Sequence, residues 1–193
     1  AYISNTSSRL TNFTLISDTN YVAQNGSRVT RALFDICLKK GWPVAAEKVL
    51  NVAKSIDHRM WWTQSPLRRF LHVLPFDAVA RLEERYDIDT LFTLSVDEIG
   101  VAVHSPRVAE KIVQHMKYLP YLLVDVHVQP LTQGILKVSV DVRCDFEWND
   151  LYHGSVEAWW MWVEDDHAMY HAEHVLIHKA QRLDVIQCTF HVP

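Results

Sequence analysis

The chain has 193 residues, of which 49% are hydrophobic and 22% are charged, and its formal net charge is −4. These proportions are typical of a globular protein with one or two domains, and no apolar run approaches the ~20 residues of a transmembrane helix. Cys37, Cys144 and Cys188 are far apart and lie among apolar neighbours. We therefore expect buried, reduced thiols in a protein of the nucleus or cytoplasm rather than a disulfide framework.

The charge is divided unevenly along the chain. Residues 1–75 hold 10 Lys and Arg against 4 Asp and Glu, residues 76–119 hold 5 against 8, and residues 120–193 hold 4 against 11. A basic first part attracts phosphate groups, whereas an acidic last part repels them and is better suited to contacts with protein.

Residues 1–65 are predicted to form a helical bundle whose main element is one long helix over residues 20–40. The apolar residues of this segment recur at helical spacing and predict an apolar stripe along one face: Val22, Val29, Leu33, Ile36 and Cys37. Ser17 or Asp18 can cap the helix, and Gly41 ends it. A second helix, predicted over about 43–61, would lie antiparallel to it.

The other side of the helix at 20–40 is polar, with Gln24, Arg28, Arg31 and Asp35 at the same period. At 1.5 Å per residue the helix spans roughly 30 Å, so this line of amide and guanidinium groups can follow the wall of a channel for a polyanion. The alternative is a surface helix whose polar face is only solvated, and the pattern alone favours that alternative.

Residues 66–119 are predicted to form a helix-loop-helix domain of short helices. One helix is expected over about 76–86. Ser95 and Glu98 have the spacing of a capping box that begins another. Ser105 precedes a proline at the first position of a third helix, which runs to about Tyr118.

Residues 120–193 change to a period of two. Alternation is clear from Leu122 to Val128 and from Leu136 to Val142, and further strands are predicted over about 156–164, 168–179 and 183–192. Short strands separated by regular turns are typical of an antiparallel β-sandwich. The predicted fold class is thus α+β and multidomain: a helical bundle, a helix-loop-helix domain and a sandwich.

Motifs for catalysis and cofactor binding are absent. The sequence has no G-x-x-x-x-G-K-[ST], no G-x-G-x-x-G and no G-x-S-x-G. His167, His171, His174 and His178 would share one face of a helix, as in a zinc site, but on the predicted strand the first two face one way and the last two the other. We expect no catalytic residue, no metal site and no cofactor in this chain.

Two aromatic groups leave alternatives open. On a strand, Trp160 and Trp162 share one face and Trp159 takes the other, so one face is core and the opposite face suits a partner surface. Trp61 and Trp62 lie among arginines, an arrangement that can stack on bases or pack between modules.

Several segments form an ordered set: those at 20–25 with Arg28 and 31–34, at 65–68, at 97–100, at 129–132, and at 145–150 with 153–154, 159–160 and 163–165. In this order they resemble the Sec-sixty-three homology unit of Ski-two-like RNA helicases. The branch of that family in the activating signal cointegrator complex is most similar, and the spliceosomal branch is nearly as close. The resemblance covers almost the whole chain.

The resemblance implies an immunoglobulin- or fibronectin-like sandwich, and a unit that packs on two RecA-like motor domains and a winged helix of the same protein. ATP and magnesium would then belong to the motor domains only. The helix at 20–40 matches the family's ratchet helix, which lies along the single strand that the motor pulls. Asn25 and Arg28 match its RNA-lining side, and helical period adds Gln24 and Arg31.

Two functional hypotheses follow. In the first, the chain is a non-catalytic accessory module that guides single-stranded RNA past a helicase motor and also docks partner proteins. In the second, it is purely a protein-interaction scaffold whose acidic sandwich docks the partners. A third reading is the homologous unit of the endoplasmic-reticulum translocon subunit; the helicase motifs and the lack of a membrane-spanning run count against it.

Overall fold

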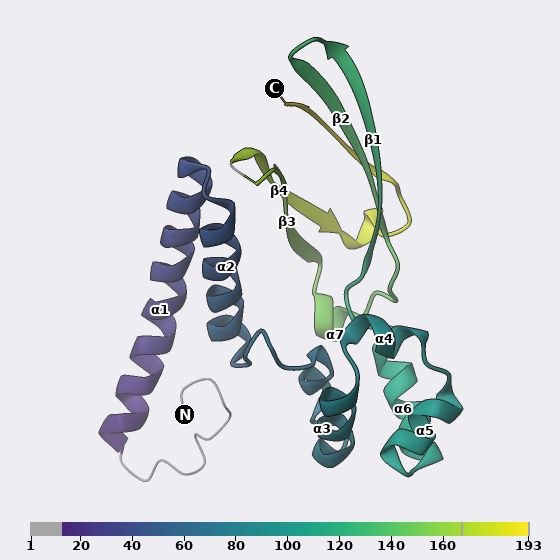
Figure 1. Ribbon diagram of the computed structural model, residues 1–193. Coiled ribbons are helices and arrows are strands. Elements are labelled where there is room, and N and C mark those ends of the chain that lie inside the picture. The colour runs from purple at the N-terminus through teal and green to yellow at the C-terminus, as the bar shows by residue number, and fades with distance from the viewer. Residues whose placement is uncertain (1–12, 167, 193) are drawn as a thin grey trace. The chain divides into compact units, whose positions relative to one another are not determined.

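The computed structural model describes residues 13–166 and 168–192 (Figure 1). It confirms a mixed helical and antiparallel β architecture, with helices in the first part of the chain and, among the described residues, all strands after residue 121. The chain forms two compact units. One comprises the chain up to Ser65 together with Glu164–Met169, and the other comprises Pro66–Val163 and the chain from Tyr170 onward.

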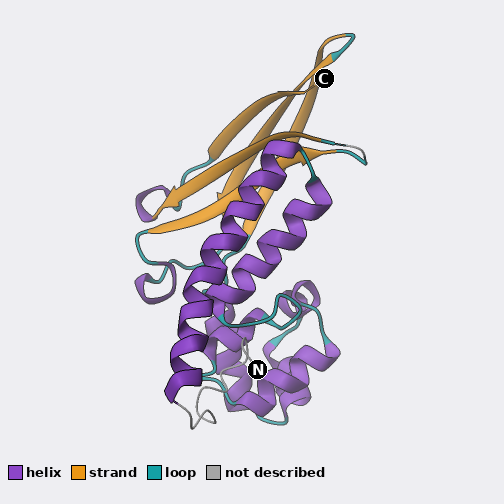
Figure 2. Cartoon of the chain, turned by 90° about the vertical axis from the view of Figure 1, so that its left-hand side faces the viewer, coloured by secondary structure: helices purple, strands orange, loops and turns teal. Residues whose placement is uncertain are grey.

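The first unit is built on an antiparallel pair of helices, α1 (Phe13–Lys40) and α2 (Pro43–His58) (Figure 2). Gly41 has a φ of +65°, a conformation that glycine adopts without strain, and it turns the chain between the helices. The predicted caps at Ser17 and Asp18 are wrong, because both residues lie within α1. No helix in the described part of the chain is long and apolar enough to cross a membrane.

The predicted apolar stripe of α1 is exposed rather than buried, except at Cys37. Val22, Val29, Leu33 and Ile36 are 46–57% exposed, whereas the buried residues of the pair are Phe34, Cys37, Ala46, Ala53 and Ser55. The two helices pack through small side chains, which bring their backbones close, and such residues contribute little to a hydrophobic pattern. The larger aliphatic residues of α1 are consequently left on a separate, exposed face.

The second unit begins with a helical cluster. Its elements are the 3₁₀ helix η2 (Pro66–Phe70), α3 (Phe76–Arg85), α4 (Ile88–Thr93), α5 (Val96–Val103) and α6 (Pro106–Met116). The predicted capping box is confirmed: the Glu98 amide donates to Ser95 Oγ at 3.3 Å, and the Ser95 amide donates to Glu98 Oε2 at 2.8 Å. Ser105 does precede α6, but its side chain makes no capping hydrogen bond.

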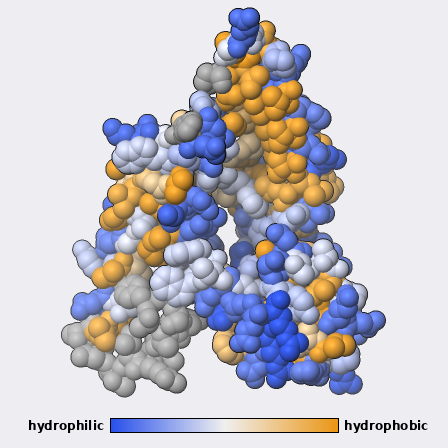
Figure 3. All heavy atoms as spheres, in the orientation of Figure 1, coloured by the Kyte–Doolittle hydropathy of each residue, from blue (hydrophilic) through white to orange (hydrophobic). Residues whose placement is uncertain are grey.

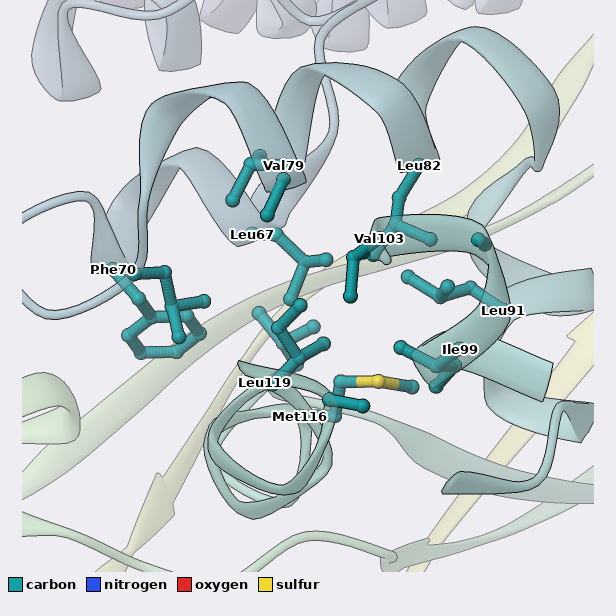
Figure 4. Close-up of a cluster of buried hydrophobic side chains, with 14 residues drawn as sticks. Leu67, Phe70, Val79, Leu82, Leu91, Ile99, Val103, Met116 and Leu119 are labelled. Carbon is teal, nitrogen blue, oxygen red and sulfur yellow. The ribbon is translucent and has the colours of Figure 1, made fainter. Parts of the chain in front are cut away.

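The core of this cluster joins all of its helices. Figure 4 shows Leu67 of η2 beside Val79 of α3, and the same cluster contains Phe70 of η2, Leu82 of α3 and Ile99 of α5. These five residues are at most 1% exposed. Burying each is worth about 1.5–3 kcal/mol, so the predicted helix-loop-helix cluster has a core of its own.

The strands form two sheets. β1 (Leu122–Thr132), β2 (Ile135–Cys144) and β5 (Ile186–Val192) pair antiparallel in the order β1-β2-β5, while β3 (Val156–Glu164) pairs with β4 (Met169–His178). One apolar core contains residues of β2, β3, β4 and β5, including Val142, Ile177 and Phe190. The short helices α7 (Asp150–His153) and η3 (Lys179–Gln181) connect strands.

The apolar face of the three-stranded sheet extends beyond its covered part. Val124, Val126 and Val128 of β1 pair directly with the buried valines of β2 and therefore lie on the same side of the sheet. They are nevertheless 53–57% exposed. Figure 3 shows the apolar atoms gathered over this part of the β1–β2 hairpin.

His153 of α7 connects the helical cluster to the sheets within the second unit. It is 5% exposed. Its Nδ1 accepts a hydrogen bond from the Asn149 amide at 2.9 Å, so its Nε2 carries the proton and donates to the Tyr118 carbonyl at 2.8 Å. The ring also packs on Phe146, with the ring centroids 4.9 Å apart.

We predict that His153→Ala lowers the free energy of unfolding by about 2–4 kcal/mol, because it removes the partner of the part-buried Asn149 amide and Tyr118 carbonyl and leaves a cavity where the buried ring was. Urea unfolding monitored by circular dichroism measures the change. His127→Ala, on the exposed strand β1, is the matched control and should change stability by less than about 0.5 kcal/mol. Equal effects of the two substitutions would contradict the structural role of His153.

Candidate nucleic-acid interface

The polar line predicted on α1 lies at the surface of the first unit. Gln24, Arg28 and Arg31 are exposed and Asn25 is half-buried. Residues three, four and seven positions apart share a face of a helix, so Gln24, Arg28 and Arg31 form one row, which the exposed acidic residue Asp35 continues one turn further on. On one side of α1, the face that packs on α2 lies between this row and the exposed apolar face.

Arg31 differs from Arg28 because it is held by α2. Its Nη2 atom donates to Asp57 Oδ2 at 2.7 Å, and Ser27 Oγ donates to Asp57 Oδ1 at 2.5 Å. Both oxygens of one carboxylate on α2 are therefore bound by α1. In the part of the chain that the structure describes, the guanidinium of Arg28 has no such ion pair.

This contact between α1 and α2 affects the pKa of Asp57. Partial burial would raise the pKa of Asp57, but the hydrogen bonds from Arg31 and Ser27 oppose that effect and bring the pKa below its ordinary value of 3.8. The carboxylate is consequently charged at neutral pH, and it neutralises Arg31. Most of the free positive charge of the row therefore belongs to Arg28.

Asn25 is also partly engaged. Its Nδ2 atom donates to the Tyr21 carbonyl at 2.8 Å, one turn earlier in α1, so its amide is oriented by the helix backbone. Tyr21 itself is 68% exposed and lies three and seven positions before Gln24 and Arg28. The prediction from sequence did not include it; its i, i+3, i+7 spacing with those two residues was the available signal.

The histidines singled out in the sequence do not gather into a metal site within the described residues. No group of three or more His, Cys, Asp or Glu side chains in residues 13–166 and 168–192 is arranged to hold a metal ion. His174 and His178 lie on the face of β4 opposite to the buried Val175 and Ile177, as alternation predicts, whereas His171 faces the core and packs on Phe190; His167 lies outside the described residues.

The cysteines are likewise suited to packing rather than to reaction. Cys37 and Cys188 are buried, Cys144 is half-buried, and none forms a disulfide. Burial, and then the nearby carboxylates of Glu173 and Glu157 respectively, raise the pKa of the Cys188 and Cys144 thiols. A thiol with a raised pKa stays protonated and is a poor nucleophile.

Comparison with known proteins identifies the family of the whole chain. The model of the Sec63 Brl domain family matches residues 1–193. The chain therefore belongs to the Sec63 Brl domain family, and the resemblance noted from the sequence is confirmed.

Two groups of relatives are similar over most of the chain. "Activating signal cointegrator 1 complex subunit 3" of Mus musculus is 45% identical over 174 residues, which cover 88% of this chain and 8% of that protein. The "U5 small nuclear ribonucleoprotein 200 kDa helicase" of Homo sapiens is 37% identical over 188 residues, which cover 96% of this chain and 9% of that protein. The chain thus spans less than a tenth of the length of these relatives.

We predict that Asp57→Asn lowers the free energy of unfolding by about 1 kcal/mol at pH 7, because it removes the ion pair that joins α1 to α2. The pKa of Asp57 is lowered in the folded state, so its stabilisation is present above the ordinary pKa and is lost as the pH falls through the folded value. Urea unfolding at pH 7 and pH 3 should show a difference between the two proteins at pH 7 that shrinks at pH 3. A difference independent of pH would contradict this assignment.

Proposed function

We propose that this chain is a non-catalytic module of an ATP-dependent RNA helicase, in which α1 guides single-stranded RNA past the motor. The observation that carries the proposal is the row of Gln24 and Arg28 on the exposed face of a 28-residue helix, in a chain of the Sec63 Brl domain family. One similar protein is named a helicase. Nuclear or cytoplasmic RNA would be the substrate of the whole protein.

The chemistry of the row suits a strand that moves. A guanidinium contacts phosphate, and an amide can donate to phosphate or ribose; neither contact selects a base sequence. Contacts of this kind hold a strand without fixing its register. The side chains of the row follow one another along a helix that rises 1.5 Å per residue. Neighbouring phosphates of a bound strand can therefore meet neighbouring side chains of the row.

The structure leads us to assign different roles to the four predicted residues. Arg28 is the main phosphate contact and Gln24 donates a hydrogen bond beside it. Arg31 contributes chiefly by fixing α1 on α2 through Asp57, and Asn25 supports the row from a half-buried position. ATP and magnesium would be bound by RecA-like motor domains elsewhere in the protein, since this sequence contains no phosphate-binding loop.

The sandwich supports a second role, the docking of partner proteins. We propose that it is of the immunoglobulin or fibronectin III type, because the order β1-β2-β5 with β3-β4 opposite corresponds to strands A, B and E in one sheet with C and C′ in the other. Residues 120–193 hold 4 basic against 11 acidic side chains. Trp160 stacks on His174 on the face of β3 and β4 away from the core, which suits a contact with protein rather than with RNA.

We predict that Arg28→Glu weakens binding of single-stranded RNA about tenfold at low salt and reduces by about 1 the slope of log affinity against log salt concentration, because a phosphate contact is lost. Fluorescence anisotropy of a labelled oligouridylate over a salt series measures both quantities. Arg28 is preferable to Arg31 for this test, since replacing Arg31 also breaks the contact with Asp57.

The matched control is Arg107→Glu, which makes the same charge change on an exposed residue in the first turn of α6. A glutamate there is favourable to the helix dipole and should not disturb folding. Equal binding by wild type and Arg28→Glu, or an equal loss with Arg107→Glu, would contradict guidance by α1. The first of these outcomes would favour the docking role alone.

A further inference from the structure

Two adjacent tryptophans follow the end of α2 and remain at the surface. Trp61 is 43% exposed and Trp62 is 52% exposed. Large aromatic side chains are usually buried for most of their area. Trp61 and Trp62 are neighbouring exceptions to this tendency, and they lie in the basic part of the chain. They are therefore candidates for contact with a ligand.

The backbone holds these tryptophans in place without burying their rings. The Trp62 amide donates to Ser55 Oγ at 3.1 Å, and Ser55 is only 1% exposed. The Trp61 amide donates to Gln64 Oε1 at 3.0 Å, and the Gln64 amide returns a bond to the Trp61 carbonyl at 3.0 Å. The segment is consequently ordered before any ligand arrives, which reduces the entropy cost of binding.

The two rings form an edge-to-face pair. Their centroids are 5.9 Å apart and their planes are inclined at 74°. The pair therefore presents ring surfaces in two directions, and a planar group that stacks on one ring would lie beside the other.

The tryptophans lie at the same end of the helix pair as Gln24 and Arg28. Asp57 of α2 binds Ser27 and Arg31, and a Cβ on Gly26 would lie 3.6 Å from Ile56 Cδ1. The last turn of α2 is thus level with residues 26–31 of α1. The Trp62 amide is hydrogen-bonded to Ser55 in that turn, so the two tryptophans stay close to the end of α2.

The charged residue nearest to the pair in sequence is basic. Arg59, two residues before Trp61, is exposed and adopts the left-handed region with a φ of 52°, where glycine is the usual residue. The acidic residue nearest to it in sequence, Asp57, is neutralised by Arg31. A cation at this position attracts a phosphate next to the aromatic rings.

We propose that Trp61 and Trp62 form a stacking platform for bases of the single strand whose phosphates Arg28 contacts. This inference rests on the proposed function and extends it, because it assigns the bases as well as the backbone. Exposed aromatics beside cations are how proteins bind single strands without reading sequence: every base has a flat face. The platform would hold a base at the end of the row on α1.

The test uses the 193-residue chain and two labelled probes, an oligouridylate and the same ribose-phosphate backbone without bases. Trp62→Leu should weaken binding of the oligouridylate about tenfold, since one stacked base contributes that much or more. It should leave binding of the abasic backbone and the salt slope unchanged. Trp61→Leu should act in the same direction, and Trp62→Phe should restore most of the lost affinity because it keeps an aromatic face.

Trp42→Leu is the matched control, because Trp42 is 55% exposed but precedes α2 at the opposite end of the helix pair. Circular dichroism confirms that each variant is folded. Unchanged binding of the oligouridylate by both Trp61→Leu and Trp62→Leu would overturn the platform. An equal loss of binding to the abasic backbone would also overturn it, and would point to a contact with protein or a structural role.

The proposed function would survive those outcomes if Arg28→Glu still weakens binding of the abasic backbone. It would itself fail if the wild-type chain binds neither probe.

Discussion

The contact between Asp57 and the side chains of Ser27 and Arg31 is the constraint on which the first unit depends. It joins the last turn of α2 to the middle of α1 at 2.5 Å and 2.7 Å. It favours the rotation of α1 in which Gln24 and Arg28 face solvent while Phe34 and Cys37 are buried. The same contact fixes the level of the tryptophans that follow α2. One carboxylate thus positions both the phosphate contact and the stacking platform that we propose.

Local sequence signals predicted the elements well because each has a strong physical cause. Proline at the start of α2 and α6, the capping box at Ser95, and the alternating residues of β2 all specify structure within a few residues. The sides of β4 were also predicted correctly, because a period of two leaves only two choices. The lengths of helices were less accurate, as in α1, which extends past the expected cap at Ser17.

The packing face of α1 could not be predicted from hydrophobicity. The stripe of Val22, Val29 and Leu33 has the stronger apolar period, yet α2 packs on a neighbouring face through small side chains such as Ala46 and Ala53. Which face is used depends on the partner helix, and in particular on Asp57, which is 26 positions from Arg31 in sequence. The polar row was recognised from its period, but the engagement of Arg31 by α2 and the ordering of Trp62 by Ser55 both depend on contacts between distant residues.

Photo-crosslinking tests the central claim most directly, because it maps where a bound strand lies. A single-stranded RNA with 4-thiouridine would be irradiated with the 193-residue chain, and the crosslinked peptides identified by mass spectrometry. The account predicts crosslinks within residues 21–31 of α1 and within residues 59–64, and a loss of both in Arg28→Glu at moderate salt. Crosslinks confined to residues 120–193, or crosslinks on α1 that Arg28→Glu leaves unchanged, would contradict it.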